Sequence, residues 1–381
     1  MIKFDAKTQI VISDDIKSDI WNLLQEEGAI NVVMLVDENV VKYDPLIEMK
    51  NYLSNKAKLS THVITSKEPT TDMVNEFTSC LRGEKIDMFI GIGGGSIIDL
   101  TKALSVMVVN GGRVEDYHGT GKKFSSGVKK IMIPTTAGTG SEVTPGAVLI
   151  NSHKKFKRSI GGKYVTPDYA VLNAEFTSSM PENIAASTGM DALGHAIESF
   201  TARNANSITR MYSREAFSLI VNNLQKALRD KQDTVARQNV LLGSCLAGYA
   251  IYNSNTGAAH SMSYPLGIYN NIPHGIAVAH LLPTVVRINV EKGCFLYAEL
   301  YDLIANVRSR EGNERKSELF VSFLEDFEPL RYIDKTIQDY GVNLNNCEFL
   351  AERGLDLKPA LNNNPVEFGL NDAKRALKEL L

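Results

Sequence analysis

Cysteine is scarce in this chain of 381 residues, and its acidic and basic residues nearly balance. The four cysteines lie far apart and form no C-x-x-C pair, which argues against a disulfide framework or a cysteine zinc cluster and indicates reduced thiols. With 28 glycines and only 12 prolines, the sequence is neither collagenous nor of low complexity. The formal net charge of -3 provides no basic field for a phosphate backbone, so we expect no nucleic-acid partner.

Long uncharged apolar runs are also missing, so we expect no membrane-spanning segment and no membrane partner. The first residues do not resemble a signal peptide, because Lys3, Asp5 and Lys7 interrupt what would have to be an apolar stretch. Together with the reduced cysteines, these absences predict a cytoplasmic protein. The remaining composition, 44% hydrophobic and 22% charged, is that of a globular protein, and the length favours two domains.

Short apolar runs alternate with amphipathic stretches in the first half of the chain. The runs with the composition of buried strands are 29–36, 59–65, 86–92, 130–134 and 169–173. Helical patterns such as 16–27 and 71–82 lie between them. Because strands that alternate with helices form parallel sheets covered on both faces, this half predicts an α/β domain with a parallel sheet.

The pattern changes after about residue 180, where Pro181 lies and strand patterns end. Long helical patterns such as 208–227 and 234–252 continue to the end of the chain. We therefore predict an α/β domain at 1–180 and an all-helical domain at 181–381. No flexible linker separates them, so we expect close packing with a cleft between the two domains.

A glycine-rich loop at 91–96 follows the third strand run and leads into a predicted helix. Successive glycines let the backbone approach a pyrophosphate, and free N–H groups with the helix dipole attract its negative charge. The loop departs from the G-x-G-x-x-G spacing, because Ser96 occupies the place of the last glycine. Taken by itself, the loop is either a phosphate site or a simple strand-to-helix turn.

Two further features favour a nucleotide. The segment 134–142 (PTTAGTGSE) mixes hydroxyl side chains with small residues, a composition able to surround a phosphate and a ribose, although a threonine-rich turn would look the same. Asp37 closes the first strand run, where a carboxylate would bind the adenosine ribose and repel a 2′-phosphate. Helix capping is the alternative interpretation of Asp37. If it faces the ribose, Asp37 predicts NAD(H) in preference to NADP(H).

Asp191 and His195 are four residues apart, so a helix would project both from one face. Such a pair can hold a cation, although an ordinary contact along a helix is the alternative. His260 and His274 follow downstream. Pro265 and Gly267 lie between them and predict a break in the helix, at which the chain turns back. One carboxylate with three imidazoles is typical of a catalytic site for a divalent first-row metal.

These motifs together resemble the iron-containing, or group III, metal-dependent alcohol dehydrogenases over nearly the whole chain. The matching segments, in the family's order, are GGGSIIDLTKA (93–103), PTTAGTGSEVTP (134–145), TGMDALGHAIESF (188–200) and HSMSYPLGIYNNIPHGIAVAHLLP (260–283). The resemblance implies a Rossmann-like dinucleotide-binding domain at 1–180 and a helical metal-binding and substrate domain of the dehydroquinate synthase type at 181–381. It also implies NAD(P) in the cleft and a homodimer. The implied metal is Fe²⁺, or Zn²⁺ in its place, on Asp191, His195, His260 and His274.

The same resemblance assigns the cofactor contacts residue by residue. Asp37 matches the residue that faces the adenosine ribose. The pyrophosphate loop comprises Gly94, Gly95, Ser96 and Asp99. The second nucleotide segment supplies Thr135, Thr136, Thr139 and Ser141, and Lys157 matches a basic residue near the cofactor.

The chain departs from the family pattern four residues after His260, where many relatives carry a second histidine with a proton-relay role. That position is Tyr264 in this chain. A phenol has an ordinary pKa near 10, so it relays protons only if the metal or the nicotinamide lowers that pKa. Tyr264 is therefore either the catalytic acid and base or a residue that shapes the pocket.

The implied activity is hydride transfer between a nicotinamide and a primary alcohol or aldehyde held at the metal, running towards aldehyde reduction. The small-molecule substrate is an alcohol or aldehyde, and a polar, phosphonate-derived or sugar-derived aldehyde is one option. The alternatives are a glycerol-type polyol dehydrogenase, a dehydroquinate synthase-like lyase of the same fold, and a non-catalytic nucleotide-binding protein.

Overall fold

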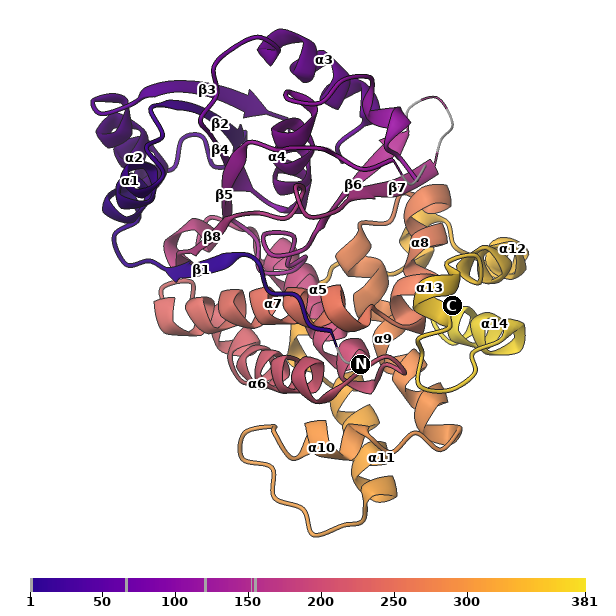
Figure 1. The fold of residues 1–381 in the computed structure, drawn as a ribbon. Coiled ribbons are helices and arrows are strands. Elements are labelled where there is room, and N and C mark those ends of the chain that lie inside the picture. The colour runs from indigo at the N-terminus through magenta and orange to yellow at the C-terminus, as the bar shows by residue number, and fades with distance from the viewer. Residues whose placement is uncertain (1–2, 66–67, 120–121, 152, 154–155) are drawn as a thin grey trace. The chain divides into compact units, whose positions relative to one another are not determined.

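A computed structural model describes residues 3–65, 68–119, 122–151, 153 and 156–381. The chain divides into two compact units, which we describe separately (Figure 1). The α/β unit comprises Ala6–Thr136 and Gly140–Ser179. The helical unit comprises Met180–Leu381, the segment Ala137–Thr139 and a short N-terminal stretch that ends at Asp5.

The elements have the following bounds. The strands are β1 (Gln9–Ile12), β2 (Asn31–Asp37), β3 (Lys58–Ile64), β4 (Met88–Gly93), β5 (Lys129–Pro134), β6 (Gly146–Asn151), β7 (Phe156–Gly161) and β8 (Tyr169–Leu172). The α-helices are α1 (Ile16–Glu26), α2 (Asp44–Ser54), α3 (Thr71–Leu81), α4 (Gly95–Met107), α5 (Glu182–Thr201), α6 (Ser207–Arg229), α7 (Thr234–Ser254), α8 (Ala258–Asn270), α9 (His274–Glu291), α10 (Tyr297–Tyr301), α11 (Asn313–Glu325), α12 (Leu344–Gly354), α13 (Lys358–Leu361) and α14 (Leu370–Lys378). Short 3-10 helices are η1 (Val114–Asp116), η2 (Ala174–Thr177), η3 (Glu328–Tyr332) and η4 (Gln338–Tyr340).

The α/β unit is built on a parallel sheet in the order β1-β8-β5-β4-β2-β3. Side chains on β2 alternate between two hydrophobic clusters, as the two-residue period of a strand requires. Val32, Met34 and Val36 pack with apolar residues of α1 and α2, whereas Val33 and Leu35 pack with those of α3 and α4. The prediction of a parallel sheet covered on both faces is confirmed, and the Rossmann-like fold with it.

The carboxyl ends of three neighbouring strands bring the predicted nucleotide segments together. Val36 on β2 pairs with Ile92 on β4, one residue before Gly93, and Gly93 pairs with Pro134 on β5. The N–H of Thr135 donates to the carbonyl of Gly93 at 3.0 Å. In open parallel sheets this edge is where ligands bind.

The helical unit contains no strand among its described residues, which confirms the predicted helical second half. Helix α5 is its central element, because nearly every residue from Ala186 to Thr201 is buried. Helices α6, α7 and α9 all pack against α5. No described helix in the structure combines the length and apolarity that crossing a membrane requires.

One local prediction in the helical unit is wrong. The helix does not break at Pro265 but continues to Asn270, because a proline removes a single backbone donor and the turns on either side retain theirs. The chain turns at Asn271, whose left-handed φ of 54° ends α8, and Ile272 N–H bonds back to the carbonyl of Leu266. His274 is therefore the first residue of α9.

Candidate metal centre

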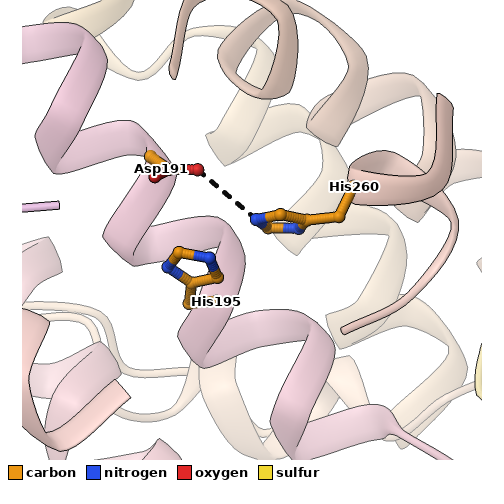
Figure 2. A group of neighbouring side chains, drawn as sticks. All are labelled: Asp191, His195 and His260. Carbon is orange, nitrogen blue, oxygen red and sulfur yellow. Dashed lines mark ion pairs between the residues drawn. The ribbon is translucent and has the colours of Figure 1, made fainter. Parts of the chain in front are cut away.

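Asp191 and His195 project from the same face of α5, as their four-residue spacing predicts, and His260 reaches the same point from α8 (Figure 2). All three are buried, with exposures of 3%, 5% and 4%. Each offers one ligand atom, and these atoms lie within 4.8 Å of one another. Side chains from two helices thus meet at one buried point.

His274, the fourth predicted ligand, is the first residue of α9. Its Nε2 lies 3.6 Å from Oδ1 of Asp191, and the Nε2 of His260 lies 3.3 Å from the same oxygen. His274 is the most open of the four, since 35% of its side chain is exposed. Two imidazole nitrogens thus lie within 3.6 Å of one carboxylate oxygen, and His274 lies beside the compact group that Asp191, His195 and His260 form.

The Nδ1 atom of each imidazole is held by a neighbour. Nδ1 of His260 lies 2.5 Å from Oε2 of Glu198, and Nδ1 of His195 lies 3.2 Å from the carbonyl oxygen of Gly138. Nδ1 of His274 lies 3.3 Å from the hydroxyl of Ser263. Carboxylate and carbonyl oxygens only accept, so they require a proton on Nδ1 of His260 and His195. Nε2 is then the nitrogen of both rings that is left to bind a metal ion.

The electrostatics of the centre favour a cation. Burial would raise the pKa of the Asp191 carboxyl, but the surrounding imidazoles hold it below its ordinary value. Burial lowers the pKa of His195 to about 4, which leaves a neutral ring. Burial opposes protonation of His260 as well, yet the carboxylates of Glu198 and Asp191 raise its pKa to about 10, so Nε2 carries a proton that a bound metal ion would replace. Two buried carboxylates thus stabilise positive charge at this point.

A divalent metal ion fits this donor set. Oδ1 of Asp191 and Nε2 of His260 are buried, and within the described part of the chain neither has a hydrogen-bond partner. A buried polar atom left in this state costs roughly 1–3 kcal/mol. One carboxylate oxygen and three imidazole nitrogens are ligands that Zn²⁺ and Fe²⁺ accept.

A glycine makes room for the imidazole of His260. A Cβ at position 194 would lie 2.9 Å from Cγ1 of Val278 and 3.4 Å from Cε1 of His260. Any side chain at Gly194 would therefore displace α9 or the ring. This requirement explains why a glycine directly precedes His195 in a buried helix.

The predicted pyrophosphate loop opens α4. Gly94 is the N-terminal cap, Gly95 and Ser96 form the first turn, and no side chain of the described residues caps the helix. The first turn carries no acidic residue either. Helix N–H groups that no side chain caps can bind a phosphate.

Asp99 and Ser141, two predicted cofactor contacts, bond to each other. The hydroxyl of Ser141 donates to Oδ1 of Asp99, and the N–H of Val148 donates to Oδ2 at 2.8 Å. Lys102, which is fully buried, donates to the carbonyl and hydroxyl oxygens of Ser141 at 2.7 Å and lies 3.2 Å from Asp99. This group of side chains ties α4 to the threonine-rich segment and to β6.

The other predicted cofactor residues differ in their surroundings. Oδ1 of Asp37 accepts bonds from the backbone N–H of Asn39 at 2.9 Å and from its side chain, so Asp37 closes a turn and does not cap a helix. Lys157 on β7 forms an ion pair with Glu68. Thr135 is buried, whereas Thr136 and Thr139 are half-buried. A Cβ on the loop glycine Gly94 would lie 3.3 Å from the side chain of Thr136, so this threonine lies against the glycine loop.

Tyr264 lies one helical turn after His260 on α8 and is half-buried. Its ring meets that of His274 edge to face, with centroids 6.3 Å apart and an interplanar angle of 82°. The phenol is thus next to the most open of the four predicted ligands.

Sequence reasoning missed four residues around these sites. The sequence does contain a signal for Glu198. After Glu182, the first residue of α5, the titratable residues of this helix are Asp191, His195 and Glu198, whose spacings of four and three place them on one face. Lys102 lies within the matching segment at 93–103, where a lysine on a helix is typical of an exposed residue. The carbonyl of Gly138 and the hydroxyl of Ser263 carry no sequence signal of their own.

Comparison with known proteins agrees with this geometry. The family model described as "Iron-containing alcohol dehydrogenase" matches residues 7–174. A second model, described as "Fe-containing alcohol dehydrogenase family, C-terminal", matches residues 185–381. The two models together span both units.

Individual relatives cover most of the chain. The long-chain-alcohol dehydrogenase 1 of Geobacillus thermodenitrificans is 33% identical and covers 89% of this chain and 86% of its own. The sulfoacetaldehyde reductase of Bilophila wadsworthia is 32% identical and covers 78% of both chains. The crystal structure of the sulfoacetaldehyde reductase from Bifidobacterium kashiwanohense in complex with NAD⁺ superimposes with a TM-score of 0.88 at 26% identity, over 100% of this chain and 98% of that one.

These findings confirm the resemblance seen in the sequence and favour none of the alternatives, neither the polyol dehydrogenase, the lyase nor the non-catalytic protein. The chain belongs to the iron-containing alcohol dehydrogenase family and is an oxidoreductase that interconverts alcohols and aldehydes.

Proposed function

We propose that this enzyme reduces an aldehyde to a primary alcohol with NADH at a divalent metal, Fe²⁺, held by Asp191, His195, His260 and His274. The observation that carries the proposal is the approach of two Nε2 atoms to a single buried carboxylate oxygen, at 3.3 and 3.6 Å. Zn²⁺ accepts the same ligands and is the alternative ion.

When bound, the metal supplies Lewis acidity to the substrate oxygen and the nicotinamide supplies the hydride. The residues of the chain supply position and protons. The neighbours at Nδ1 fix the rings of His195, His260 and His274. Tyr264 is the proposed acid, whose hydroxyl gives a proton to the substrate oxygen during reduction and takes it back during oxidation.

The cofactor proposal rests on the carboxyl edge of the sheet. We propose that the first turn of α4 binds the pyrophosphate and that Asp37 binds the adenosine ribose, which favours NAD(H) over NADP(H). Asp37 ends β2 next to β4, the strand that leads into the loop, which supports this placement. The NAD⁺ complex of the reductase from Bifidobacterium kashiwanohense supports the same cofactor.

For the substrate, we propose a short polar aldehyde. Two of the similar proteins are named as sulfoacetaldehyde reductases, and Tyr264 places a polar hydroxyl where an imidazole is common in the family. The long-chain-alcohol dehydrogenase of Geobacillus thermodenitrificans supports an apolar aldehyde as the competing class.

An aldehyde panel tests this proposal. The enzyme is loaded anaerobically with Fe²⁺, and NADH oxidation is followed with sulfoacetaldehyde, phosphonoacetaldehyde, butanal and decanal, with chelator-treated enzyme as the blank. We expect the highest kcat/KM with a polar aldehyde and no turnover in the blank. A preference for decanal would contradict the substrate class, and full activity in the blank would contradict the metal.

Two finer properties are proposals of the same kind. We propose a cytoplasmic enzyme, because all four cysteines are free thiols and an NADH-linked reductase needs a reduced nucleotide pool. We also propose a homodimer, which light scattering on the purified protein tests directly.

A further inference from the structure

Glu198 is a buried carboxylate that the reaction above does not use. It lies on α5, one turn after His195, and only 6% of its side chain is exposed. Burying an unpaired carboxylate is very costly, so partners must offset its lost hydration. Neighbouring donors hold the pKa of this carboxyl below its ordinary value, although burial acts to raise it.

Three donors converge on Glu198, and all come from the start of α8. Nδ1 of His260 lies 2.5 Å from Oε2, and the N–H of Gly257 donates to the same oxygen at 2.9 Å. The N–H of Ala259 donates to Oε1 at 2.7 Å. Both carboxylate oxygens are therefore occupied by a single turn of the neighbouring helix.

Glu198 caps α8 from outside. The N-cap residue of α8 is Gly257, which has no side chain to satisfy the first N–H groups. A Cβ at this glycine would lie 2.9 Å from Oε1 and 3.1 Å from Cδ of Glu198. The glycine thus leaves the space that the carboxylate fills, and the charge also favours the positive end of the helix.

The same carboxylate fixes the ring of His260. It accepts the proton of Nδ1, so Nε2 is the nitrogen left to bind a metal ion, and Nε2 is the atom 3.3 Å from Asp191. Because Asp191 and Glu198 lie on the same helix, α5 determines both where the ligand nitrogen of His260 lies and which tautomer it adopts.

We propose that Glu198 is a positioning residue of the metal centre, which holds His260 and the first turn of α8 in the geometry that binds the ion. This inference rests on the metal centre proposed above. Partners of this kind at the far nitrogen of a ligand histidine typically change metal affinity 10- to 100-fold. Glu198 acts through His260 and does not touch the ion or the substrate.

Glu198→Gln is the sharpest variant, because it keeps the shape and removes one acceptor. If the amide nitrogen replaces Oε2, it faces the donors of His260 and Gly257; if it replaces Oε1, it faces the N–H of Ala259. Gly257→Ala is the complementary variant, because its methyl group displaces the carboxylate without changing any charge.

The test titrates Co²⁺ into metal-free enzyme and follows the visible absorption of the ion, which reports its ligands and geometry. We expect Glu198→Gln and Gly257→Ala to bind Co²⁺ roughly 10- to 100-fold more weakly than wild type and to shift the spectrum. A residue that merely stabilised the fold would lower the melting temperature without shifting the spectrum of the filled site. Glu182→Gln is the matched control, since Glu182 begins the same helix, is half exposed and pairs with Lys231.

His260→Ala separates the two proposals. If it loses Co²⁺ while Glu198→Gln and Gly257→Ala bind the ion with wild-type affinity and spectrum, the role of Glu198 is refuted and the metal centre stands. If His260→Ala itself binds Co²⁺ like wild type, the proposed metal centre is refuted, and so is the proposed role of Glu198.

Discussion

Oδ1 of Asp191 and Nε2 of His260 face each other at 3.3 Å in the interior of the helical unit, and no hydrogen bond among the described residues satisfies either atom. The two residues come from different helices, α5 and α8 (Figure 2). Glu198 holds Nδ1 of His260, so the opposite nitrogen of the ring faces Asp191. Such an arrangement is stable only if a cation, a proton or a metal ion, lies between the two atoms.

Asp37 governs the choice between NADH and NADPH in this account. A carboxylate at the ribose repels a 2′-phosphate, so wild-type kcat/KM is higher with NADH, and Asp37→Ser narrows the gap. Steady-state kinetics with both cofactors measure this, and Glu38→Gln, an exposed neighbour, is the control. Equal use of both cofactors by the wild type would show that Asp37 only closes its turn with Asn39.

Tyr264→Phe separates proton transfer from packing. The variant keeps the ring against His274 and removes only the hydroxyl. If Tyr264 is the acid, kcat falls by roughly 10²–10⁴ and the pH–rate profile loses its basic limb. An unchanged profile with nearly normal kcat would contradict the proton role, and a changed KM in Tyr264→Ala would then identify a residue that shapes the pocket.

Lys102 holds the two nucleotide segments of the α/β unit together. Lys102→Met removes the buried cation beside Asp99 and the donor contacts to Ser141 and Thr144, so we expect the free energy of unfolding to fall by about 3–5 kcal/mol. NADH should also bind more weakly, because the loops lose their alignment. Urea unfolding and NADH fluorescence test both effects, with the exposed Lys123→Met as the control. Unchanged stability would contradict this role.

Lys130 makes stability depend on pH. Its side chain is 2% exposed, and burial lowers its pKa to about 8, against the opposing charge of Asp168. Between pH 8 and about 10.5 the unfolded chain keeps a proton on Lys130 that the folded chain has lost. The free energy of unfolding therefore rises with pH through this range, by up to about 3 kcal/mol. Lys130→Met should lack this rise. Urea unfolding at a series of pH values compares the two, and parallel curves would contradict the prediction.

The sequence predicts the fold well where its patterns are long and local. The strand runs at 86–92 and 130–134 correspond to β4 and β5 within two residues, because continuous apolar runs mark strands buried on both faces. Strand β1 was missed, because its four residues lie at the sheet edge and leave Ile12 exposed. The break predicted at Pro265 failed, because tertiary packing retains a helix that propensity alone would end.

The candidate site likewise has residues that the sequence predicts and residues that it does not. Asp191 and His195 follow from spacing on one helix. The approach of His260 and His274 rested on a break at Pro265, which does not occur, and on the resemblance, because it depends on how α8 and α9 pack on α5. The support around the ligands was not predicted. A backbone carbonyl at Gly138 and a hydroxyl at Ser263 acquire their roles only when distant segments meet.

The most direct test of the central claim is the metal content of the purified enzyme after anaerobic reconstitution with Fe²⁺, measured by plasma mass spectrometry. We expect about one ion per chain in the wild type. His274→Ala should lose most of the metal and the turnover, whereas His280→Ala, on the same helix but bonded to the carbonyl of Lys335, should keep both. Wild-type metal content and rate in His274→Ala would contradict the assignment of the site.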